Sequence, residues 1–450
     1  MADASNPHAN DWSWLPVDVF SRVIDPVSPH DIRALRLVCR DWCQNIRLSV
    51  RSFSATKVEH RFQVTKIAEI FPRLEQISVH CDKLQWDAGA LQPIQSLSAL
   101  RKLEIRNPSC GYSLYALSRL KRLTELHILQ SAWEPGGWQL GFLKELTTLK
   151  VLELSETKDL CLLSRLRGLH SLTRLTLKYC EGIKGRDLTV LENLGGLRSL
   201  ELNGFGYDLQ KLKLGALSNL EVLNVAYCQK VGGGVFLLDA CISCPKLVVL
   251  DLGHCEGLKD EDFCDLGELG TLKALNIAHC RIVTDAVMFS VSSLKNLRWL
   301  NISGLRTLSS QILESLQDLH NLEAMVAHYC PFVTDDVLRA WVQLDKLKLL
   351  GCAWCHLITD TGIEHASKLS NLIHLDVTGC DKITKASLAR VQKLKSLRFF
   401  GVRHTQIAKE GFEARAVNDS VCVELCREVL GGQAELLSEG GMVDSWLKGI

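Results

Sequence analysis

The chain has 450 residues, and its 52 Lys and Arg against 51 Asp and Glu give a formal net charge of +1 at pH 7. A protein that works mainly on nucleic acid needs a basic excess to neutralise phosphates, so this balance argues against that class. With 47% hydrophobic and 23% charged residues, the composition is that of a folded chain. We see no signal peptide and no apolar run near the ~20 residues of a membrane helix. We therefore expect a cytoplasmic or nuclear protein without a membrane partner.

The N-terminal part of the chain predicts a polar tail followed by a small helical module. Residues 1–10 are polar and predict a disordered tail. The segment 11–52 predicts helices, because Pro16 suits the first turn of one helix and Pro26 ends it. Ser28 then suits the cap of a second helix, and apolar residues follow at helical spacing. The module is therefore expected to be all-α.

The motifs of this module resemble those of the F-box family. They stand in that family's order as Leu15-Pro16-Val17-Asp18-Val19-Phe20, Val23-Ile24, Pro29-His30-Asp31-Ile32 and Leu37-Val38-Cys39-Arg40-Asp41-Trp42. The resemblance implies a helical surface that binds the Skp-type adaptor of a cullin-based ubiquitin ligase. The adaptor-binding positions that it implies are Leu15, Pro16, Val19, Phe20, Ile24, Val38 and Trp42. The alternative is that residues 11–52 only cap the exposed end of the repeats that follow.

Fourteen repeats of the pattern Leu-x-x-Leu-x-Leu dominate residues 74–417. Residues 53–73 lack a Gly/Ser-rich or Pro-rich run and predict an ordered junction or a degenerate repeat. The first leucines of the repeats are Leu74, Leu100, Leu123, Leu149, Leu172, Leu197, Leu220, Leu247, Leu272, Leu297, Leu322, Leu347, Leu372 and Leu397. Of the 28 fourth and sixth positions, 26 hold Leu, Ile, Val, Met or Phe, and the exceptions are Ala327 and Cys352. These repeats account for many of the 78 leucines in the chain.

Two further features recur at fixed places in the repeats. The ninth position is cysteine in seven units, at Cys180, Cys228, Cys255, Cys280, Cys330, Cys355 and Cys380. An apolar residue, Thr and Asp often follow, as at Val333-Thr334-Asp335, which fits the start of a helix. The pattern resembles the cysteine-containing class of leucine-rich repeats. In that class the cysteine is a small side chain packed against a turn, so we expect free buried thiols rather than disulfides.

The repeats predict an α/β fold, a leucine-rich-repeat solenoid preceded by the small all-α F-box module. Each unit is expected to form a strand, a turn and a helix, with positions 4 and 6 inward and positions 3, 5 and 7 outward. One unit cannot bury its own leucine face, so about fourteen units must stack, in this class as a curved horseshoe. Residues 418–450 predict a capping helix and a tail, because the last unit's apolar face needs cover.

The outward positions from the seventh unit onward form the candidate substrate site on the concave face. Charge thins out there, position 5 carries short polar groups, and aromatic and imidazole side chains flank small residues. The candidate substrate-binding residues are Asn224, Tyr227, Asp251, His254, Asn276, His279, Trp299, Asn301, His328, Tyr329 and Trp354. Small residues beside large rings suit the anchor side chains of a protein partner. The alternative is that the rings pack on the neighbouring unit.

Nothing in the sequence predicts catalysis. The run Gly232-Gly233-Gly234 lacks the following Lys-Ser/Thr of a phosphate-binding loop, and no nucleophile and base are paired. We expect no cofactor, no metal and no enzymatic activity. A site for phosphorylated substrates would need clustered Arg, which the outward positions lack.

The two resemblances together imply the substrate-recognition subunit of an SCF-type (Skp–cullin–F-box) ubiquitin ligase. The F-box would bind the Skp-type adaptor and through it a cullin, and the repeats would bind a protein substrate whose identity the sequence does not give. The alternative is a leucine-rich-repeat interaction scaffold of the ribonuclease-inhibitor type with no ubiquitin-ligase role.

Overall fold

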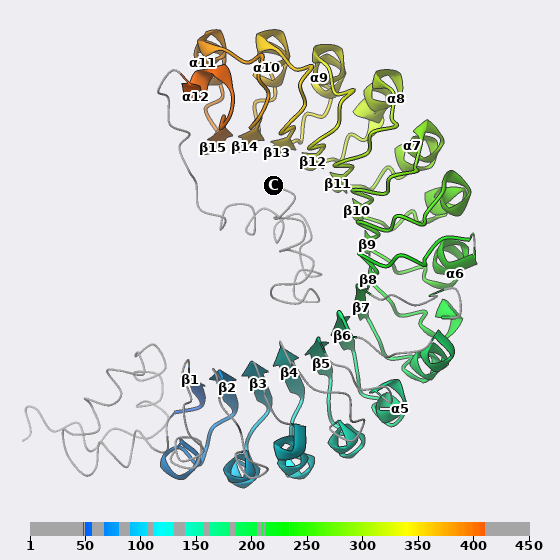
Figure 1. The fold of residues 1–450 in the computed structure, drawn as a ribbon, viewed down its shortest axis with the longest axis vertical. Helices are drawn as coiled ribbons and strands as arrows, with labels where there is room; N and C mark the ends of the chain where they lie inside the picture. Colours follow the sequence, from blue (N-terminus) through cyan, green and yellow to red (C-terminus); the bar gives the residue numbers. More distant parts are fainter. Residues whose placement is uncertain are drawn as a thin grey trace, which may run out of the picture. The chain divides into compact units, whose positions relative to one another are not determined.

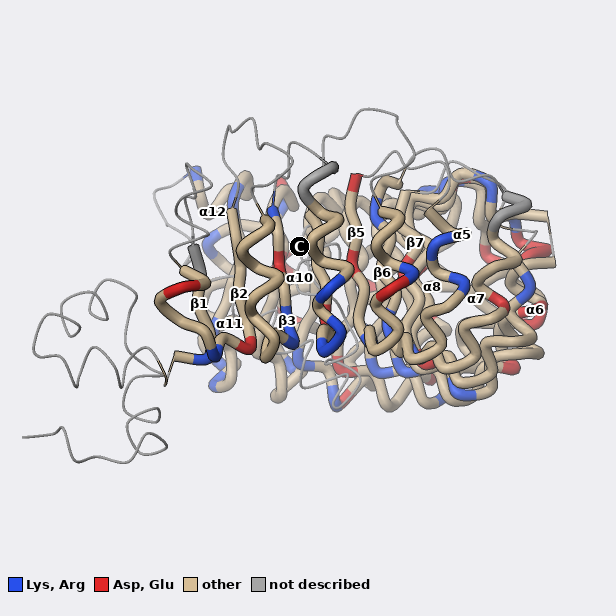
Figure 2. Tube along the Cα trace, turned by 90° about the horizontal axis from the view of Figure 1, so that it is seen from below, with Lys and Arg blue, Asp and Glu red and all other residues tan. Residues whose placement is uncertain are grey.

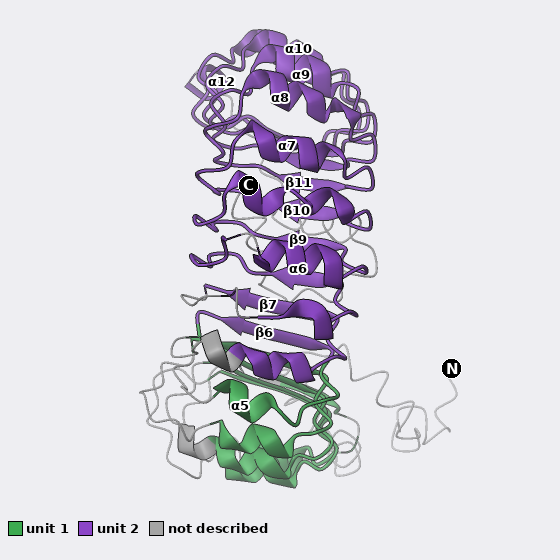
Figure 3. Cartoon of the chain, turned by 90° about the vertical axis from the view of Figure 1, so that its right-hand side faces the viewer, with its two compact units in different colours: residues 1–172, 180–183 green, residues 173–179, 184–450 purple. Residues whose placement is uncertain are grey.

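The computed structural model forms two compact units, residues 1–172 with 180–183 and residues 173–179 with 184–450 (Figure 3). The described residues are 48, 50–55, 67–80, 91–106, 111–129, 140–156, 162–180, 185–204, 209, 212–233 and 235–409. All seven predicted adaptor-binding positions, from Leu15 to Trp42, lie outside them, as does the predicted cap over 418–450.

Unit 1 is a ladder of parallel strands, each paired with the next in the sequence (Figure 1). Its strands are β1 (Ser52–Ala55), β2 (Gln76–His80), β3 (Lys102–Arg106), β4 (Glu125–Leu129) and β5 (Val151–Ser155). Its helical segments are η1 (Gln92–Ser96), η2 (Gly111–Arg119), η3 (Gly141–Glu145) and α5 (Leu162–Leu166). The pairing of β1 with β2 places one strand ahead of the first leucine repeat.

Unit 2 continues the same plan, again with parallel pairing of consecutive strands. Its strands are β6 (Arg174–Lys178), β7 (Ser199–Asn203), β8 (Val222–Asn224), β9 (Val249–Asp251), β10 (Ala274–Asn276), β11 (Trp299–Asn301), β12 (Ala324–Val326), β13 (Leu349–Gly351), β14 (His374–Asp376) and β15 (Phe399–Gly401). Its helical segments are η4 (Gly185–Asn193), η6 (Leu214–Ala216), α6 (Val235–Ser243), η7 (Asp260–Phe263), η8 (Leu266–Glu268), α7 (Asp285–Ser292), α8 (Ser310–Ser315), η9 (Leu316–Asp318), α9 (Asp335–Trp341), α10 (Asp360–Ala366), η10 (Lys385–Ser387), α11 (Leu388–Val391) and α12 (Gln406–Lys409).

The leucine spacing fixes where every strand begins. Each strand from β2 to β15 starts two residues after the first leucine of its repeat. In the unit of β10, Leu272, Leu275 and Ile277 are all fully buried. The two exceptions to the pattern, Ala327 and Cys352, are equally buried. This confirms the predicted solenoid of strand-containing repeats, whose leucines form a continuous core within each unit.

The helices are shorter than the predicted strand-turn-helix scheme suggests. In the described part of unit 1, the segments η1, η2 and η3 are 3-10 helices. The helices α7 to α10 of unit 2 follow Thr or Ser caps, as predicted: for example, Thr284 accepts a hydrogen bond from the backbone N–H of Ala286, and Thr359 accepts one from Thr361. A repeat of about 25 residues leaves few for a helix, and a capping side chain that accepts from a free N–H group stabilises its first turn.

In four repeats, an Asp at the first position of a helical segment links that repeat to the next. Asp335 accepts hydrogen bonds from the backbone N–H and the hydroxyl of Thr359 in the next unit, at 2.9 and 2.6 Å. The same pair of bonds joins Asp260 to Thr284, Asp285 to Ser309 and Asp360 to Thr384. Burial raises the pKa of Asp360, but hydrogen bonds from Ser387 and Thr384 outweigh it and hold that pKa below its ordinary value. The Thr-Asp pattern therefore starts a helix and joins two units.

The cysteines at position 9 are free and buried, which confirms the predicted thiols. Each donates to the backbone carbonyl of position 6 in the preceding unit, for example Cys255 to Val225 at 3.1 Å and Cys280 to Leu252 at 3.3 Å. Burial raises the pKa of Cys280 and of Cys330 to about 12. These thiols therefore stay protonated and serve as small donors in the core.

Basic and acidic residues are interspersed along the described trace, in keeping with the balanced net charge (Figure 2). Among the described residues, no helix is long and apolar enough to cross a bilayer.

Candidate functional site

A column of residues with positive φ follows the strands of unit 2. The eighth position of every repeat from β6 to β15 has this left-handed conformation, as does Glu156 after β5. Three of these positions are glycine, at Gly204, Gly304 and Gly379. The others in unit 2 are aromatic or imidazole residues, and we name them the ring column: Tyr179, Tyr227, His254, His279, Tyr329, Trp354 and His404.

The turn at position 8 extends the strand pairing by one hydrogen bond. The backbone N–H of His254 donates to the carbonyl of Ala278 in the next unit at 2.7 Å, and that of Tyr329 donates to Ala353 at 2.8 Å. A left-handed conformation costs about 1–2 kcal/mol for a residue that is not glycine. Since glycine fills the same place in three units, the backbone does not require rings there. Where position 8 carries a ring, the contacts of that ring must therefore offset the free-energy cost of the left-handed backbone.

The rings of the column stack on one another along unit 2. Tyr227 and His254 have ring centroids 4.4 Å apart with planes at 9°, and His254 and His279 are 4.3 Å apart at 18°. Tyr329 and Trp354 form a second parallel pair, with centroids 6.1 Å apart and planes at 6°. Such pairs contribute about 0.5–1.5 kcal/mol each, which is comparable to the backbone cost.

The glycines of the column make room for the ring of the preceding unit. A Cβ atom at Gly204 would collide with Tyr179, one at Gly304 with His279, and one at Gly379 with Trp354. Across two of these gaps the rings still approach each other, with Tyr179 6.4 Å from Tyr227 and Trp354 5.6 Å from His404. Glycine at these three places therefore keeps the column nearly continuous.

We expect Gly379→Ala to lower the free energy of unfolding by about 1–3 kcal/mol, because the methyl group strains a positive φ and pushes the Trp354 ring aside. Gly270→Ala is the matched control, since no heavy atom lies within 4 Å of the added carbon. That control is expected to change stability by less than about 0.5 kcal/mol. Urea denaturation followed by circular dichroism measures both. Equal stability of the two variants would contradict this role for Gly379.

The ring column is partly exposed, and the pKa values of its residues His254 and His279 are lowered. The exposed fractions of Tyr179, Tyr227 and Tyr329 are 51%, 39% and 47%. Burial, followed by the neighbouring His279, lowers the pKa of His254 to about 4. Burial also lowers the pKa of His279, with Arg281 acting in the same direction. The column therefore offers neutral ring faces and edges rather than a charged surface.

The short polar side chains at position 5, which we name the position-5 ladder, are buried. The sequence had placed them on a binding surface. Asn224 and Asp251 are fully buried, and Asn276 and Asn301 are 4% and 2% exposed. Each accepts a hydrogen bond from the backbone N–H two residues on, for example Ala278 to Asn276 at 3.0 Å. These side chains satisfy the backbone where each strand ends, so they are structural in this arrangement.

Two of the predicted large side chains are buried as well. Trp299 in β11 is fully buried, and His328 is 1% exposed. The backbone N–H of Ala353 donates to Nδ1 of His328 at 2.8 Å, which fixes the proton of a neutral ring on Nε2. Of the predicted substrate site, the structure therefore keeps five residues together on one surface. They are Tyr227, His254, His279, Tyr329 and Trp354.

A family model described as "Leucine-rich repeat region" matches residues 155–426, which is more than half of the chain. The chain belongs to the leucine-rich repeat family. In this leucine-rich repeat protein the match covers every residue of the ring column. No curated protein matches the chain at a significant level.

Solved structures with the same kind of fold are distant in sequence. A leucine-rich repeat protein of Leptospira interrogans is 16% identical over 82% of this chain and 93% of that chain, with a TM-score of 0.51. An internalin of Listeria monocytogenes is 19% identical over 83% and 93%, with a TM-score of 0.48. A chain of the yeast Rad7–Elc1 complex is 17% identical over 74% and 91%, also with 0.48. At these identities the likeness concerns the fold alone.

The chemistry of the ring column suits contact with a protein partner. Stacked, partly exposed aromatic residues with few rotatable bonds are the side chains that dominate protein–protein contacts. Within the described ranges, no group of three or more His, Cys, Asp or Glu is placed to hold a metal ion. The sequence prediction missed Tyr179, although its position at the eighth place of its repeat marks it as a column member.

Proposed function

We propose that this leucine-rich repeat protein is the substrate-recognition subunit of an SCF-type ubiquitin ligase and has no catalytic activity of its own. The observation that carries the proposal is a sequence pattern directly ahead of the repeats. Its motifs stand in the same order as in the F-box family, from Leu15-Pro16 to Val38 and Trp42. Its partners are then a Skp-type adaptor, a cullin reached through that adaptor, and a protein substrate. Such a ligase subunit would work in the cytoplasm or the nucleus.

The short connection between motif and repeats supports this role. Strand β1 begins at Ser52, ten residues after Trp42, and pairs at once with β2. A receptor of this kind acts by holding its substrate near the ubiquitin-charged enzyme, so the rate depends on the effective concentration that the connection permits. A short connection limits how far the F-box pattern can move from the first strands of the repeats, which favours a high effective concentration.

The ring column is the surface on which we place the substrate. Its rings are already stacked, so little side-chain entropy is lost when a partner covers them. Because His254 is neutral at pH 7, burying it under a partner carries no cost of removing a charge from water. We therefore expect an apolar or aromatic anchor of the substrate to lie against this column.

Capture of a purified Skp-type adaptor tests the proposal. The wild-type protein is expected to retain the adaptor, and the double variant Leu15→Asp with Val38→Asp is expected to lose it, because two charges enter an apolar interface. The matched control is Ile242→Asp with Phe289→Asp, which adds the same charges at side chains of unit 2 that are 72% and 68% exposed. Circular dichroism confirms that each variant stays folded.

Failure of the wild-type protein to retain the adaptor would reject the ligase role. The protein would then be an interaction scaffold of the ribonuclease-inhibitor type. Equal loss of capture in both double variants would show that the added charge, and not the F-box pattern, causes the loss.

A further inference from the structure

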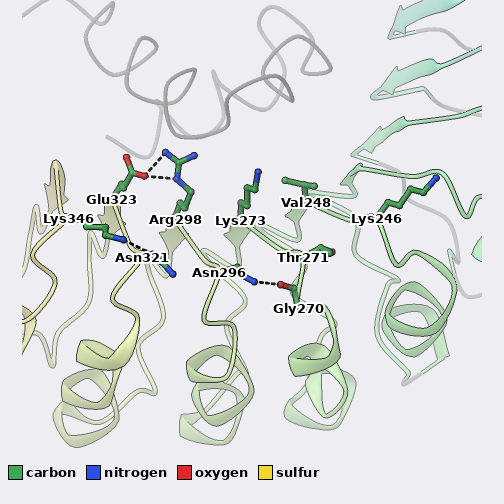
Figure 4. A pocket seen from close by; sticks show the side chains of 10 residues that line it. All are labelled: Lys246, Val248, Gly270, Thr271, Lys273, Asn296, Arg298, Asn321, Glu323 and Lys346. Atoms are coloured by element: carbon green, nitrogen blue, oxygen red, sulfur yellow. Dashed lines mark hydrogen bonds and ion pairs between the residues drawn. The ribbon is translucent and has the colours of Figure 1, made fainter.

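A cavity of about 640 Å³ lies at the amino ends of β9 to β12 in unit 2 (Figure 4). Its lining includes Val248, Lys273, Arg298 and Glu323, each of which directly precedes one of these strands. Because the strands are parallel, their amino ends meet at one edge of the sheet and the ring column follows their carboxyl ends. The cavity is therefore a second surface, separate from the ring column.

The lining carries a surplus of positive charge. Of its described lining residues, four are cations, Lys246, Lys273, Arg298 and Lys346, and one is a carboxylate, Glu323. The chain as a whole has a net charge of only +1, so this surplus is local. In the preceding repeat Glu221, which directly precedes β8, is already bound by both Nε and Nη2 of Arg198, at 2.7 and 3.0 Å.

Among the residues that the structure describes, Arg298 is the cation of this lining that forms an ion pair. Lys273 forms no ion pair with any residue that the structure describes. Nζ of Lys246 donates to the Asn219 amide oxygen, and Nζ of Lys346 donates to that of Asn321, both at 2.8 Å. A neutral amide positions an ammonium group and leaves its charge uncompensated.

Glu323, the carboxylate among the described lining residues, interacts with two cations. Glu323 is 8% exposed and accepts from Nε of Arg298 at 2.5 Å and from Nζ of Lys348 at 3.1 Å. Figure 4 shows Lys273 beside Arg298 and Glu323, with all three side chains extending to the same side of the strands. Positive charge on the described residues of this edge is therefore left without a carboxylate partner, which favours an anionic ligand.

We propose that this cavity binds an acidic segment of a protein partner, in which several Asp or Glu side chains meet Lys246, Lys273, Arg298 and Lys346. Successive parallel strands lie about 4.8 Å apart, so cations from neighbouring repeats form a row along the sheet edge. A row of separate ammonium groups matches carboxylates spread along an extended peptide. The volume is sufficient for a few such residues.

The composition of the row favours carboxylates over a single phosphate. A phosphate site is usually built on the planar fork of arginine, which binds two oxygens at once. The described lining has one arginine, Arg298, and its Nε already donates to Glu323. The proposal is independent of the ligase role, because it concerns a different face and a different measurement from adaptor capture.

Fluorescence anisotropy with labelled decapeptides tests the proposal on the full-length protein. The three probes are five Glu-Ser pairs, five Gln-Ser pairs, and the Gln-Ser peptide with one phosphoserine. The Glu-Ser peptide is expected to bind about tenfold more tightly than the Gln-Ser peptide or better, and to weaken as salt is added. Equal binding of the Glu-Ser and Gln-Ser peptides would overturn the proposal, and tighter binding of the phosphopeptide would overturn its assignment to carboxylates.

Charge reversal locates the site. Lys246→Glu with Lys273→Glu is expected to weaken binding of the Glu-Ser peptide by about tenfold or more. The control, Lys368→Glu with Lys393→Glu, makes the same change in net charge at two exposed lysines of unit 2 outside the cavity and is expected to retain binding. Melting curves confirm that both variants fold. If both double variants lost binding of the Glu-Ser peptide equally, the proposed site would be overturned. The loss would then follow from the overall charge of the protein and not from the cavity.

Discussion

Lowering the pH from 7 to 5 is expected to reduce the free energy of unfolding by about 4 kcal/mol through two histidines of unit 2, His328 and His374. They are 1% and 2% exposed. Burial, together with the nearby His374, lowers the pKa of His328 to about 3. Burial lowers the pKa of His374 to about 4. Both rings are therefore neutral in the folded protein at pH 5.

The sign of the effect follows from the unfolded chain, in which both imidazoles regain a pKa near 6.5. Between pH 6.5 and pH 3–4 the unfolded state binds protons that the folded state does not. The stabilisation is therefore complete above pH 6.5 and is lost as the pH falls through this window. Each group contributes about 2 kcal/mol of the loss at pH 5.

Urea denaturation at pH 7 and pH 5 measures the loss, and His374→Phe isolates one contribution. The ring of His374 stacks on Phe399, with centroids 4.1 Å apart and planes at 13°, so phenylalanine keeps the stack and removes the titrating group. The variant should lose about 2 kcal/mol less than the wild type on acidification. An identical loss in both proteins would show that His374 does not titrate as its burial requires.

The leucine spacing predicts the strands because burial alone decides them. A strand of three to five residues needs only its inward side chains to be apolar, and positions 4 and 6 supply these even where Ala327 or Cys352 replaces a larger residue. The capping Thr residues and the buried cysteines could also be predicted, because each is marked by its fixed position within a single repeat. The F-box pattern, by contrast, lies outside the described residues, so its role stays a prediction.

The parts of the sites that the sequence does not predict depend on contacts between repeats. Asn276 belongs to a column that looks like an exposed polar surface, and only the strand register shows that it accepts from the Ala278 backbone. The cavity cations Lys246, Lys273 and Arg298 stand 27 and 25 residues apart and outside the strands, so no short motif marks them. The close approach of the column glycines to the rings of the preceding repeats likewise becomes evident only when the repeats are stacked in the structure.

Replacement of Asn276 by alanine distinguishes a structural ladder from a binding surface. Its Oδ1 accepts from the Ala278 N–H at 3.0 Å, and its Nδ2 donates to Oδ1 of the fully buried Asp251 at 2.8 Å. Asn276→Ala removes a partner from a buried N–H and from a buried carboxylate, so we expect the free energy of unfolding to fall by about 2–4 kcal/mol.

Asn296→Ala is the matched control for this prediction. The Asn296 side chain also bridges two repeats, by donating to the carbonyl of Gly270 at 2.7 Å, but it is exposed to water. Water can replace the lost bond there, so a change of less than about 1 kcal/mol is expected. Urea denaturation of both variants measures the two changes in the free energy of unfolding. If Asn276→Ala were as mild as Asn296→Ala, the position-5 ladder would carry little of the fold's stability, and its side chains would again be candidates for binding a substrate.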